Sequence, residues 1–377
     1  MILGIIFTVF ALMPLPAGAV ATPDIQAKSA ILIDATTGRV FYAKAEHARR
    51  YPASTTKMLT LITALEKGNL GDTVVASQRA ATTEGSTIWL TAGETLKLSD
   101  LLYGAILASG NDATVAIAEH IAGSVEEFAE LMNEKARQIG ANESHFTNAS
   151  GLPDLNHYST AYDLAKIAAY GYKNPSFVDF VSVRRQVLPW TGKEKPRELY
   201  TENKLLWTYE GANGVKTGYT DAAGRCVIAA AQRNGIQLIA VILDSPIMWT
   251  DSMKLLDYGF VQLQPVELVK KNERRQTLPV LRGTAKTVQA VSAASIVVPM
   301  TDSEREEYQV SVQLPARLEA PVRKGEKIGI AKVLFQGQEV AATDLIADRT
   351  VERLPLLESW WSSLWGFFSQ LVMNENA

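Results

Sequence analysis

The sequence predicts an α+β protein with more than one domain, and three observations lead to this prediction. The chain has 377 residues, more than one average hydrophobic core accommodates. Helical segments come first in its N-terminal region, and strand-like apolar runs dominate residues 214–243. Residues 266–353 contain only short Val/Ile/Leu segments separated by Gly, Pro and charged clusters. We therefore expect an antiparallel sheet flanked by helices, followed by a small all-β domain of the β-sandwich type.

Local signals predict the elements of both regions. Residues 30–34 and 40–43 are apolar runs around a Gly-containing turn, which indicates a β-hairpin. Pro52 and Ser54 begin a helix that continues to Leu65. We expect further helices at 112–121, 125–139 and 160–171, strands at 214–217, 226–231 and 238–243, and C-terminal strands that include 277–281, 309–312 and 327–331.

Charge and composition exclude several classes of function. The formal net charge is -3, from 37 basic and 40 acidic residues, so there is no excess of positive charge for nucleic acid. Four histidines and one cysteine give no metal-ligand spacing. Cys226 lies in an apolar run and is expected to be a buried strand thiol rather than a reactive one. His145 and His157 are expected on a loop surface rather than in catalysis. We expect no nucleic-acid partner, no metal and no cofactor.

The first residues predict export. Residues 2–15 are nearly all apolar and lead into small residues with an Ala-x-Ala pattern, which allows cleavage after Ala19 or Ala21. The apolar run is too short to span a bilayer comfortably, although the usual basic residue before it is missing. We therefore expect residues 1–21 to be a signal peptide. A buried helix or a retained membrane segment is the alternative.

Three short motifs carry the chemistry of the predicted catalytic region. Each occurs once; the first two are weak evidence alone, and the third is rarer by chance. Their occurrence in this order is strong evidence, because the first opens a helix and the last lies on a predicted strand. The motifs are Ser54-x-x-Lys57, Ser109-Gly110-Asn111 and Lys216-Thr217-Gly218.

The spacing of the first motif predicts a nucleophile and its base. Residues three apart on a helix share a face, so the amine of Lys57 can reach the hydroxyl of Ser54. A serine hydroxyl needs a neighbouring base to remove its proton, and a lysine is a base only when its pKa is lowered. Burial and the positive end of the helix should lower it, and a nearby Lys216 would act in the same direction. The alternative role for Ser54 is a helix N-cap.

These motifs resemble those of the serine penicillin-recognising enzymes, which carry Ser-x-x-Lys, Ser-Asp-Asn and Lys-Thr-Gly. More narrowly, residues 30–260 resemble the low-molecular-mass D-alanyl-D-alanine carboxypeptidases, and Gly110 in place of the central Asp suits that branch. The resemblance implies a β-lactamase/DD-peptidase-like catalytic domain at residues 24–262 and a β-sandwich-type domain at 263–354.

The resemblance also implies catalytic roles for individual residues. Ser54 corresponds to the acylated nucleophile and Lys57 to its general base. Ser109 would relay a proton to the departing D-alanine. The backbone N–H groups of Ser54 and Tyr219 would form the oxyanion hole.

The remaining motif residues are implied to bind the substrate. Asn111 would hydrogen-bond the substrate amide and hold the lysine base. Lys216 and Thr217 would bind the terminal carboxylate, which would explain selectivity for a chain end. Gly218 would let the backbone approach the substrate. The alternatives are that the second motif is a plain turn and that Lys216 is a solvated strand residue.

The implied activity is that of a penicillin-sensitive carboxypeptidase that removes the terminal D-alanine from peptidoglycan pentapeptide stems during cell-wall biogenesis. Its partners would be these stem peptides and β-lactams, and it would work at the outer face of the cytoplasmic membrane. One alternative is a class A β-lactamase, although Leu152 stands where that class needs a glutamate. A membrane-tethered muropeptide sensor without catalysis is the other alternative.

The last residues predict a peripheral membrane anchor. In residues 356–374 the aromatic and aliphatic side chains fall on one face of a helix and serines on the other. The serine face makes spanning improbable, so the helix should lie in the membrane interface. The alternative is a helix packed on the protein's own β-domain or in an oligomer.

Overall fold

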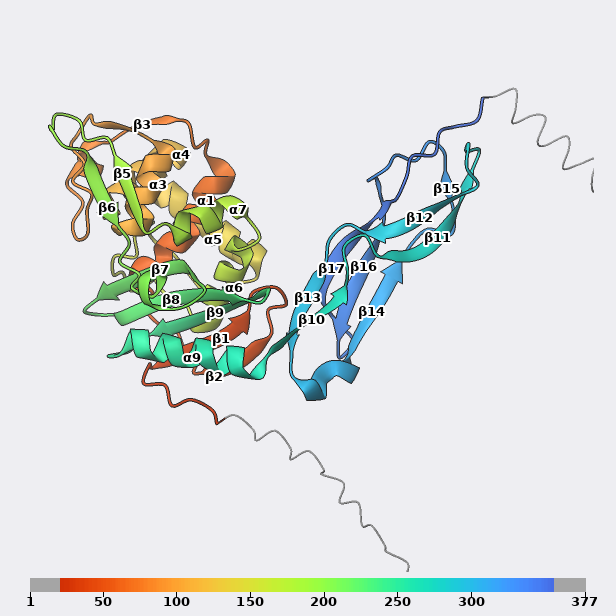
Figure 1. Cartoon of the computed structure of the whole chain (residues 1–377). Coiled ribbons are helices and arrows are strands. Elements are labelled where there is room, and N and C mark those ends of the chain that lie inside the picture. The colour runs from red at the N-terminus through yellow and green to blue at the C-terminus, as the bar shows by residue number, and fades with distance from the viewer. Residues whose placement is uncertain (1–20, 356–377) are drawn as a thin grey trace, which may run out of the picture.

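The computed structural model describes residues 21–355 (Figure 1). Helices and a central sheet make up its N-terminal part, and strands dominate the part after residue 263. The predicted α+β class and the β-rich C-terminal region are therefore confirmed. The predicted signal peptide, except for Ala21, and the predicted helix at 356–374 lie outside the described residues.

An antiparallel five-stranded sheet, in the order β2-β1-β9-β8-β7, organises the N-terminal part. The first strand of the chain pairs with the last strand of this region, with Ile31 opposite Val241. The expected hairpin and the three expected strands are all present, each a little longer than predicted. The five strands are β1 (Ser29–Asp34), β2 (Val40–Lys44), β7 (Ala212–Thr220), β8 (Gly224–Arg233) and β9 (Ile236–Leu243).

Both faces of the sheet are buried, which explains why its strands are continuous apolar runs. Alternate residues of β9 belong to two different hydrophobic cores, one containing Ile239 and Val241 and the other Ala240 and Ile242. Helix α9 (Met248–Gln262) covers the second face and packs against β8 and β9. This helix was not predicted.

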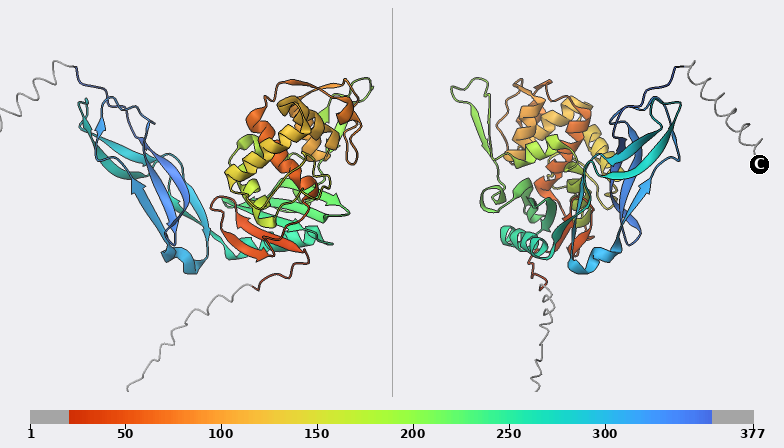
Figure 2. Two further views of the ribbon diagram at one scale, coloured as in Figure 1. Left: turned by 180° about the vertical axis from the view of Figure 1, so that it is seen from behind. Right: turned by 45° about the vertical axis from the view of Figure 1, so that its right-hand side comes forward.

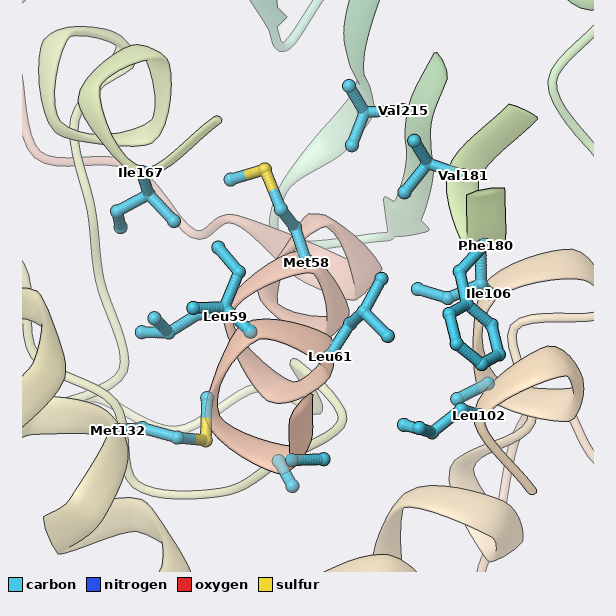
Figure 3. Packing of buried hydrophobic residues seen from close by; sticks show 14 of the residues in the cluster. Met58, Leu59, Leu61, Leu102, Ile106, Met132, Ile167, Phe180, Val181 and Val215 are labelled. Carbon is cyan, nitrogen blue, oxygen red and sulfur yellow. The ribbon is translucent and has the colours of Figure 1, made fainter. Parts of the chain in front are cut away.

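The other helices pack mainly on the opposite face of the sheet (Figure 1). Helix α1 lies at their centre, where its Met58, Leu59 and Leu61 contact side chains of the surrounding helices and of β7 (Figure 3). The four predicted helices are present within a few residues of the predicted bounds. The helices are η1 (Ala53–Thr56, a 3-10 turn), α1 (Lys57–Lys67), α2 (Gln78–Ala81), α3 (Leu98–Leu107), α4 (Asn111–Ala122), α5 (Val125–Ile139), α6 (Ala161–Gly171), α7 (Pro175–Ser182) and α8 (Leu205–Thr208).

The N-terminal part also contains two small antiparallel sheets next to the helices. The first consists of β3 (Thr73–Val75) and β4 (Thr95–Lys97), and the second of β5 (Arg185–Leu188) and β6 (Arg197–Tyr200). The hairpin β5–β6 projects from the side of the helical layer that faces away from the C-terminal strands, in all three views (Figures 1 and 2). Neither sheet was predicted.

The C-terminal strands form a six-stranded sheet, in the order β14-β16-β17-β12-β11-β15, and a two-stranded sheet β10-β13. Two separate clusters of buried apolar side chains lie among them. The strands are β10 (Gln264–Val269), β11 (Arg274–Leu281), β12 (Thr287–Ser292), β13 (Ile296–Met300), β14 (Tyr308–Gln313), β15 (Leu318–Glu319), β16 (Lys327–Phe335) and β17 (Gln338–Ala347), with the 3-10 turn η2 (Asp302–Glu307) between β13 and β14.

One arginine joins the two parts of the chain. Arg39, in the turn between β1 and β2, donates hydrogen bonds to the Pro299 carbonyl, the Tyr308 hydroxyl and the Glu304 carboxylate. Its guanidinium also lies over the ring of Phe335, 4.3 Å from the centroid. Because a planar guanidinium has five donors in a fixed arrangement, a single side chain can hold several groups of the β-rich part at once.

The loop after α5 approaches η1 so closely that only glycine fits at one position. Gly151 has φ +86, and a Cβ atom there would lie 1.8 Å from the carbonyl oxygen of Ala53. Gly38, in the turn between β1 and β2, has a similar φ of +72, but a Cβ atom there would meet nothing within 4 Å. The two glycines share the left-handed conformation and differ in the space around them.

We predict that Gly151→Ala destabilises the protein far more than Gly38→Ala does. The strain of a left-handed alanine costs about 1 kcal/mol at either position. A collision with backbone comes in addition at Gly151 and should bring the cost above about 4 kcal/mol. Urea unfolding of the two variants measures this difference. Equal losses of stability would contradict the close approach of this loop to η1.

Candidate active site

The three predicted motifs come from different elements that meet at one place. Ser54 lies in η1 and Lys57 begins α1, while Asn111 begins α4. Lys216 and Gly218 lie on β7, which is an edge strand of the five-stranded sheet and packs directly against η1. The sequence therefore folds so that residues far apart along the chain share one site.

Lys57 is the centre of this site. Its Nζ lies 2.9 Å from the Ser54 Oγ, which is the contact expected from their spacing. The same Nζ lies 2.7 Å from Oδ1 of Asn111 and 2.7 Å from the carbonyl oxygen of Ser150. The lysine side chain is fully buried. Ser54 itself makes no side-chain cap, so the N-cap role considered above is not what the structure shows.

The amide of Asn111 is held in one orientation. Its Nδ2 donates to the carbonyl oxygen of Glu84 at 2.7 Å, and its backbone N–H donates to the carbonyl oxygen of Ser86 at 2.7 Å. A carbonyl oxygen can only accept, so the NH₂ group must face Glu84 and the amide oxygen must face Lys57. The second motif is thus more than a plain turn.

The electrostatic environment favours the neutral form of Lys57. Burial lowers the pKa of Lys57 well below its ordinary value, and the ammonium group of Lys216 lowers it further. The carboxylates of Glu202 and Asp112 act in the opposite direction without cancelling these effects. Burial also lowers the pKa of Lys216, and Glu202 partly offsets this.

Lys216 and Thr217 share a carboxylate. Lys216 is 1% exposed, so the alternative of a solvated strand residue is wrong. Its Nζ lies 3.6 Å from Oε2 of Glu202, and the Thr217 hydroxyl donates to the same oxygen at 3.1 Å. The Glu202 side chain is about half exposed, which places this carboxylate at the open side of the two motif residues.

Gly218 lies directly against the nucleophile's backbone. A Cβ atom at Gly218 would be 2.8 Å from the backbone nitrogen of Ser54 and 3.0 Å from Cβ of Ala53. Any larger residue would therefore push β7 away from η1. The next residue, Tyr219, is 62% exposed, and its hydroxyl donates to Asp221 at 2.8 Å.

Ser109 lies in the turn between α3 and α4 and is buried, with a left-handed φ of 57. Within residues 21–355, no hydrogen bond joins its hydroxyl to Ser54 or to Lys57. The structure thus joins Lys57 directly to Ser54 and Asn111, whereas Ser109, two residues before Asn111, makes no direct hydrogen bond to the serine or the lysine.

Sequence reasoning assigned no role to several groups in this site. The carbonyl of Ser150 holds Lys57, but a backbone carbonyl leaves no mark in the residue type. Glu202 reaches Lys216 and Thr217 from the chain before α8, where no motif surrounds it. Asp112 is 1% exposed and influences Lys57 through its charge. Its place directly after the second motif was the only available signal.

His157 corrects a prediction. It was expected on a loop surface, but it is 1% exposed. Its Nδ1 accepts from the backbone N–H of Thr147 at 3.1 Å, so its Nε2 carries the proton that faces the Thr56 hydroxyl at 2.9 Å. Burial lowers the pKa of His157 to about 4, so the ring is neutral at physiological pH. Through its contact with Thr56, the His157 ring holds the end of η1. His145 is half-buried, and its Nδ1 lies 2.7 Å from the carbonyl oxygen of Asn156.

Cys226 lies outside this arrangement. It is fully buried on β8, and burial raises the pKa of its thiol to about 11. The prediction of a buried strand thiol is confirmed.

Comparison with known protein families gives two matches along the chain. The family model for the D-alanyl-D-alanine carboxypeptidases of peptidase family S11 matches residues 17–246. The model described as the C-terminal domain of penicillin-binding protein 5 matches residues 263–353.

Individual relatives agree with these matches. The D-alanyl-D-alanine carboxypeptidase DacF of Bacillus subtilis is 33% identical over 337 residues, which cover 87% of this chain and 86% of that protein. The crystal structure of penicillin-binding protein 5 from Haemophilus influenzae superposes with a TM-score of 0.67 at 29% identity, covering 89% of this chain and all of that one. Penicillin-binding protein 3 from Streptococcus pneumoniae gives a TM-score of 0.74 at 25% identity, covering 87% and 100%.

The family model covers more than half of the chain, and the matched relatives extend over most of it. Together with the serine and lysine geometry described above, they establish that this chain belongs to the D-alanyl-D-alanine carboxypeptidases of peptidase family S11, serine enzymes of peptidoglycan processing.

Proposed function

We propose that Ser54 is the nucleophile of this carboxypeptidase, and that the enzyme removes the terminal D-alanine from pentapeptide stems through an acyl-enzyme on Ser54. The observation that carries the proposal is the environment of the Lys57 amine. It is fully buried, and the three groups around it are the Ser54 hydroxyl and two carbonyl-type oxygens. This arrangement supplies the base that a serine nucleophile requires.

The hydrogen-bond inventory orients that base. A neutral amine has two N–H donors and one lone pair. The oxygens of Asn111 and Ser150 can only accept, so they take both N–H groups of Lys57. The lone pair is left for the third neighbour, which is the Ser54 hydroxyl. Neutral Lys57 is therefore directed to take the proton of Ser54 as the nucleophile attacks.

The acylation step follows from these groups. The Ser54 oxygen attacks the carbonyl of the penultimate D-alanine, and its proton passes to Lys57. The backbone N–H groups of Ser54 and Tyr219 stabilise the resulting oxyanion, a donor pair in which each member is worth about 3 kcal/mol. The bond to the terminal D-alanine then breaks, and Ser109 relays a proton to its nitrogen. Water releases the shortened peptide from Ser54 in a second, similar cycle.

Recognition of the chain end is assigned to Lys216 and Thr217, with Asn111 holding the substrate amide. Support comes from Glu202, whose carboxylate oxygen already lies 3.1 Å from the Thr217 hydroxyl and 3.6 Å from the Lys216 ammonium. These groups can thus accommodate a carboxylate. A terminal carboxylate held in this way would place the preceding peptide bond at Ser54. Peptide bonds inside a chain have no such carboxylate beside them, so they would not be cleaved.

β-Lactams are the expected inhibitors, because they would acylate the same serine. We assign residues 24–262 to the catalytic domain and 263–354 to a β-sandwich-type domain.

The family works outside the cytoplasm, and we place this enzyme at the outer face of the cytoplasmic membrane after loss of residues 1–21. Every helix within residues 21–355 is too short or too polar to cross a membrane. We assign the contact with the membrane to the apolar face of the helix predicted at 356–374.

We predict that Ser54→Ala abolishes D-alanine release from a pentapeptide ending in D-Ala-D-Ala, because the acyl-enzyme can no longer form. A matched control is Ser124→Ala, which removes the N-cap of α5 and should cost about 1 kcal/mol of stability while leaving release intact. Released D-alanine is measured enzymatically for both variants and the wild type. If folded Ser54→Ala released D-alanine at the wild-type rate, Ser54 could not be the nucleophile.

We predict that a chain ending at Pro355 no longer binds lipid vesicles, because it lacks the apolar face of the helix predicted at 356–374. Flotation with vesicles measures binding, and a chain ending at Asn374 is the control that retains the helix. The idea is wrong if the chain ending at Pro355 still floats with the vesicles.

A further inference from the structure

Trp89 is an exposed aromatic residue fixed between two buried ones. Its side chain is 62% exposed, whereas Ile88 and Leu90 are 0% and 4% exposed. Trp89 has a left-handed φ of 58, which is a strained conformation for a bulky residue. The two residues at the catalytic site with the same kind of strain are Ala53 and Ser109. Such strain persists only where the surroundings impose it, and it is concentrated at functional sites.

The surroundings of Trp89 impose this conformation through one buried carboxylate. The backbone N–H groups of Ile88 and Leu90 both donate to Asp112 at 3.0 Å. Asp112 is 1% exposed and directly follows Asn111 of the catalytic site. The loop is thus held on both sides of the tryptophan, and the residue that holds it is a neighbour of the catalytic machinery.

A second, half-buried tryptophan stacks against Trp89. Trp190, in the turn of the hairpin β5–β6, lies with its ring centroid 6.1 Å from that of Trp89 and its plane inclined by 24°. The two rings stack on each other, and we call this stacked pair, of which Trp89 is the exposed member, the tryptophan platform (Trp89 and Trp190). Two cations also lie over the Trp190 ring: the Arg197 guanidinium, 4.9 Å from its centroid, and the Lys193 ammonium, 5.9 Å from it.

A buried ion pair joins the two segments that carry the platform. The guanidinium of Arg197 donates to the carboxylate of Glu94 at 3.0 Å, and both side chains are 1% exposed. Arg197 also donates to the backbone carbonyls of Trp89 and Pro189, at 3.4 Å and 3.3 Å. Burying an ion pair is costly, so it is a poor device for stability alone. Here it fixes two tryptophan-bearing segments relative to each other.

The platform lies within reach of the catalytic site. The carbonyl of Ser86 accepts the backbone N–H of Asn111, and Trp89 is three residues further along the same loop. Three residues span at most about 11 Å, and four residues of an extended stem peptide span about 14 Å. A group attached at the far end of a stem peptide bound at Ser54 can therefore reach the platform.

We propose that the tryptophan platform binds a sugar ring of the glycan to which the stem peptide is attached. This inference rests on the proposed function, because the reacting peptide brings the sugar to the site. Flat, rigid aromatic faces offer apolar contact to the C–H face of a sugar at little entropic cost. The hairpin β5–β6, whose turn contains Trp190, projects on the side of the helical layer that faces away from the C-terminal strands (Figures 1 and 2). Because a stem peptide at Ser54 would bring its sugar within reach of the platform, we choose a sugar rather than a lipid surface.

The test compares two substrates of the full-length enzyme. One is a free pentapeptide ending in D-Ala-D-Ala, and the other is the same peptide linked to the disaccharide of N-acetylglucosamine and N-acetylmuramic acid. The wild type should have a kcat/KM about tenfold higher for the disaccharide-linked peptide, mainly through a lower KM. This ratio should fall towards one in Trp89→Gly, which suits the left-handed backbone and so preserves the fold, and in Trp190→Ala.

The control is Trp207→Ala, which removes a tryptophan that is 54% exposed on α8 and lies outside the platform. It should keep the wild-type ratio. A wild-type ratio of one, or an unchanged ratio in both platform variants, would overturn the sugar site while leaving the proposed function intact. Failure of the wild type to release D-alanine from the free peptide would instead overturn the proposed function.

A binding measurement separates the sugar from a membrane. Tryptophan fluorescence is titrated with a linear tetramer of N-acetylglucosamine and, separately, with phosphatidylglycerol vesicles. The tetramer should change the emission of the wild type and of Trp207→Ala but not that of Trp89→Gly. A platform variant that loses binding to vesicles and keeps binding to the tetramer would show a membrane contact and contradict the proposal.

Discussion

The buried amine of Lys57 is the constraint on which the site depends. A buried charge without partners would be costly, so the amine must be neutral or, if charged, fully hydrogen-bonded. The structure provides three hydrogen-bond partners that suit either state of the amine. Those partners come from the 3-10 turn with Ser54, from the start of α4 with Asn111, and from the loop that carries Ser150. Each of these segments must therefore lie within hydrogen-bonding distance of one atom, which explains why Gly151 allows no side chain.

The elements that hold the catalytic residues also contact the segments around the site. The edge strand β7 presses Gly218 against the backbone of the nucleophile and brings the Lys216 ammonium close enough to lower the pKa of Lys57. Two consecutive residues of α4 have different tasks: Asn111 holds the base, and Asp112 holds the loop that presents Trp89. A substitution in this short segment should thus affect both the reaction and the recognition of the substrate's remote parts.

Much of the fold could be predicted from the sequence, and the failures have physical causes. The sheet strands are buried on both faces and so appear as uninterrupted apolar runs, and the three-residue spacing placed Lys57 at Ser54. Helix α9 was missed because its inner face buries the polar Asp251 and Ser252, which breaks the apolar periodicity. The Ser150 carbonyl, Glu202 and the buried His157 were missed because long-range backbone and loop contacts create these roles.

Titration of the Lys57 amine by NMR, in protein labelled with ¹⁵N-lysine and with Lys57→Arg providing the assignment, measures directly whether this amine is the neutral base of Ser54. We expect a midpoint well below those of the exposed lysines, because burial and the Lys216 ammonium lower the pKa of Lys57. D-alanine release should rise with pH through this midpoint, because the neutral amine is the base. Glu202→Gln should lower the midpoint further, since that carboxylate raises the pKa of Lys57. If Lys57 titrated together with the exposed lysines, it would be charged at physiological pH and could not be the base that activates Ser54.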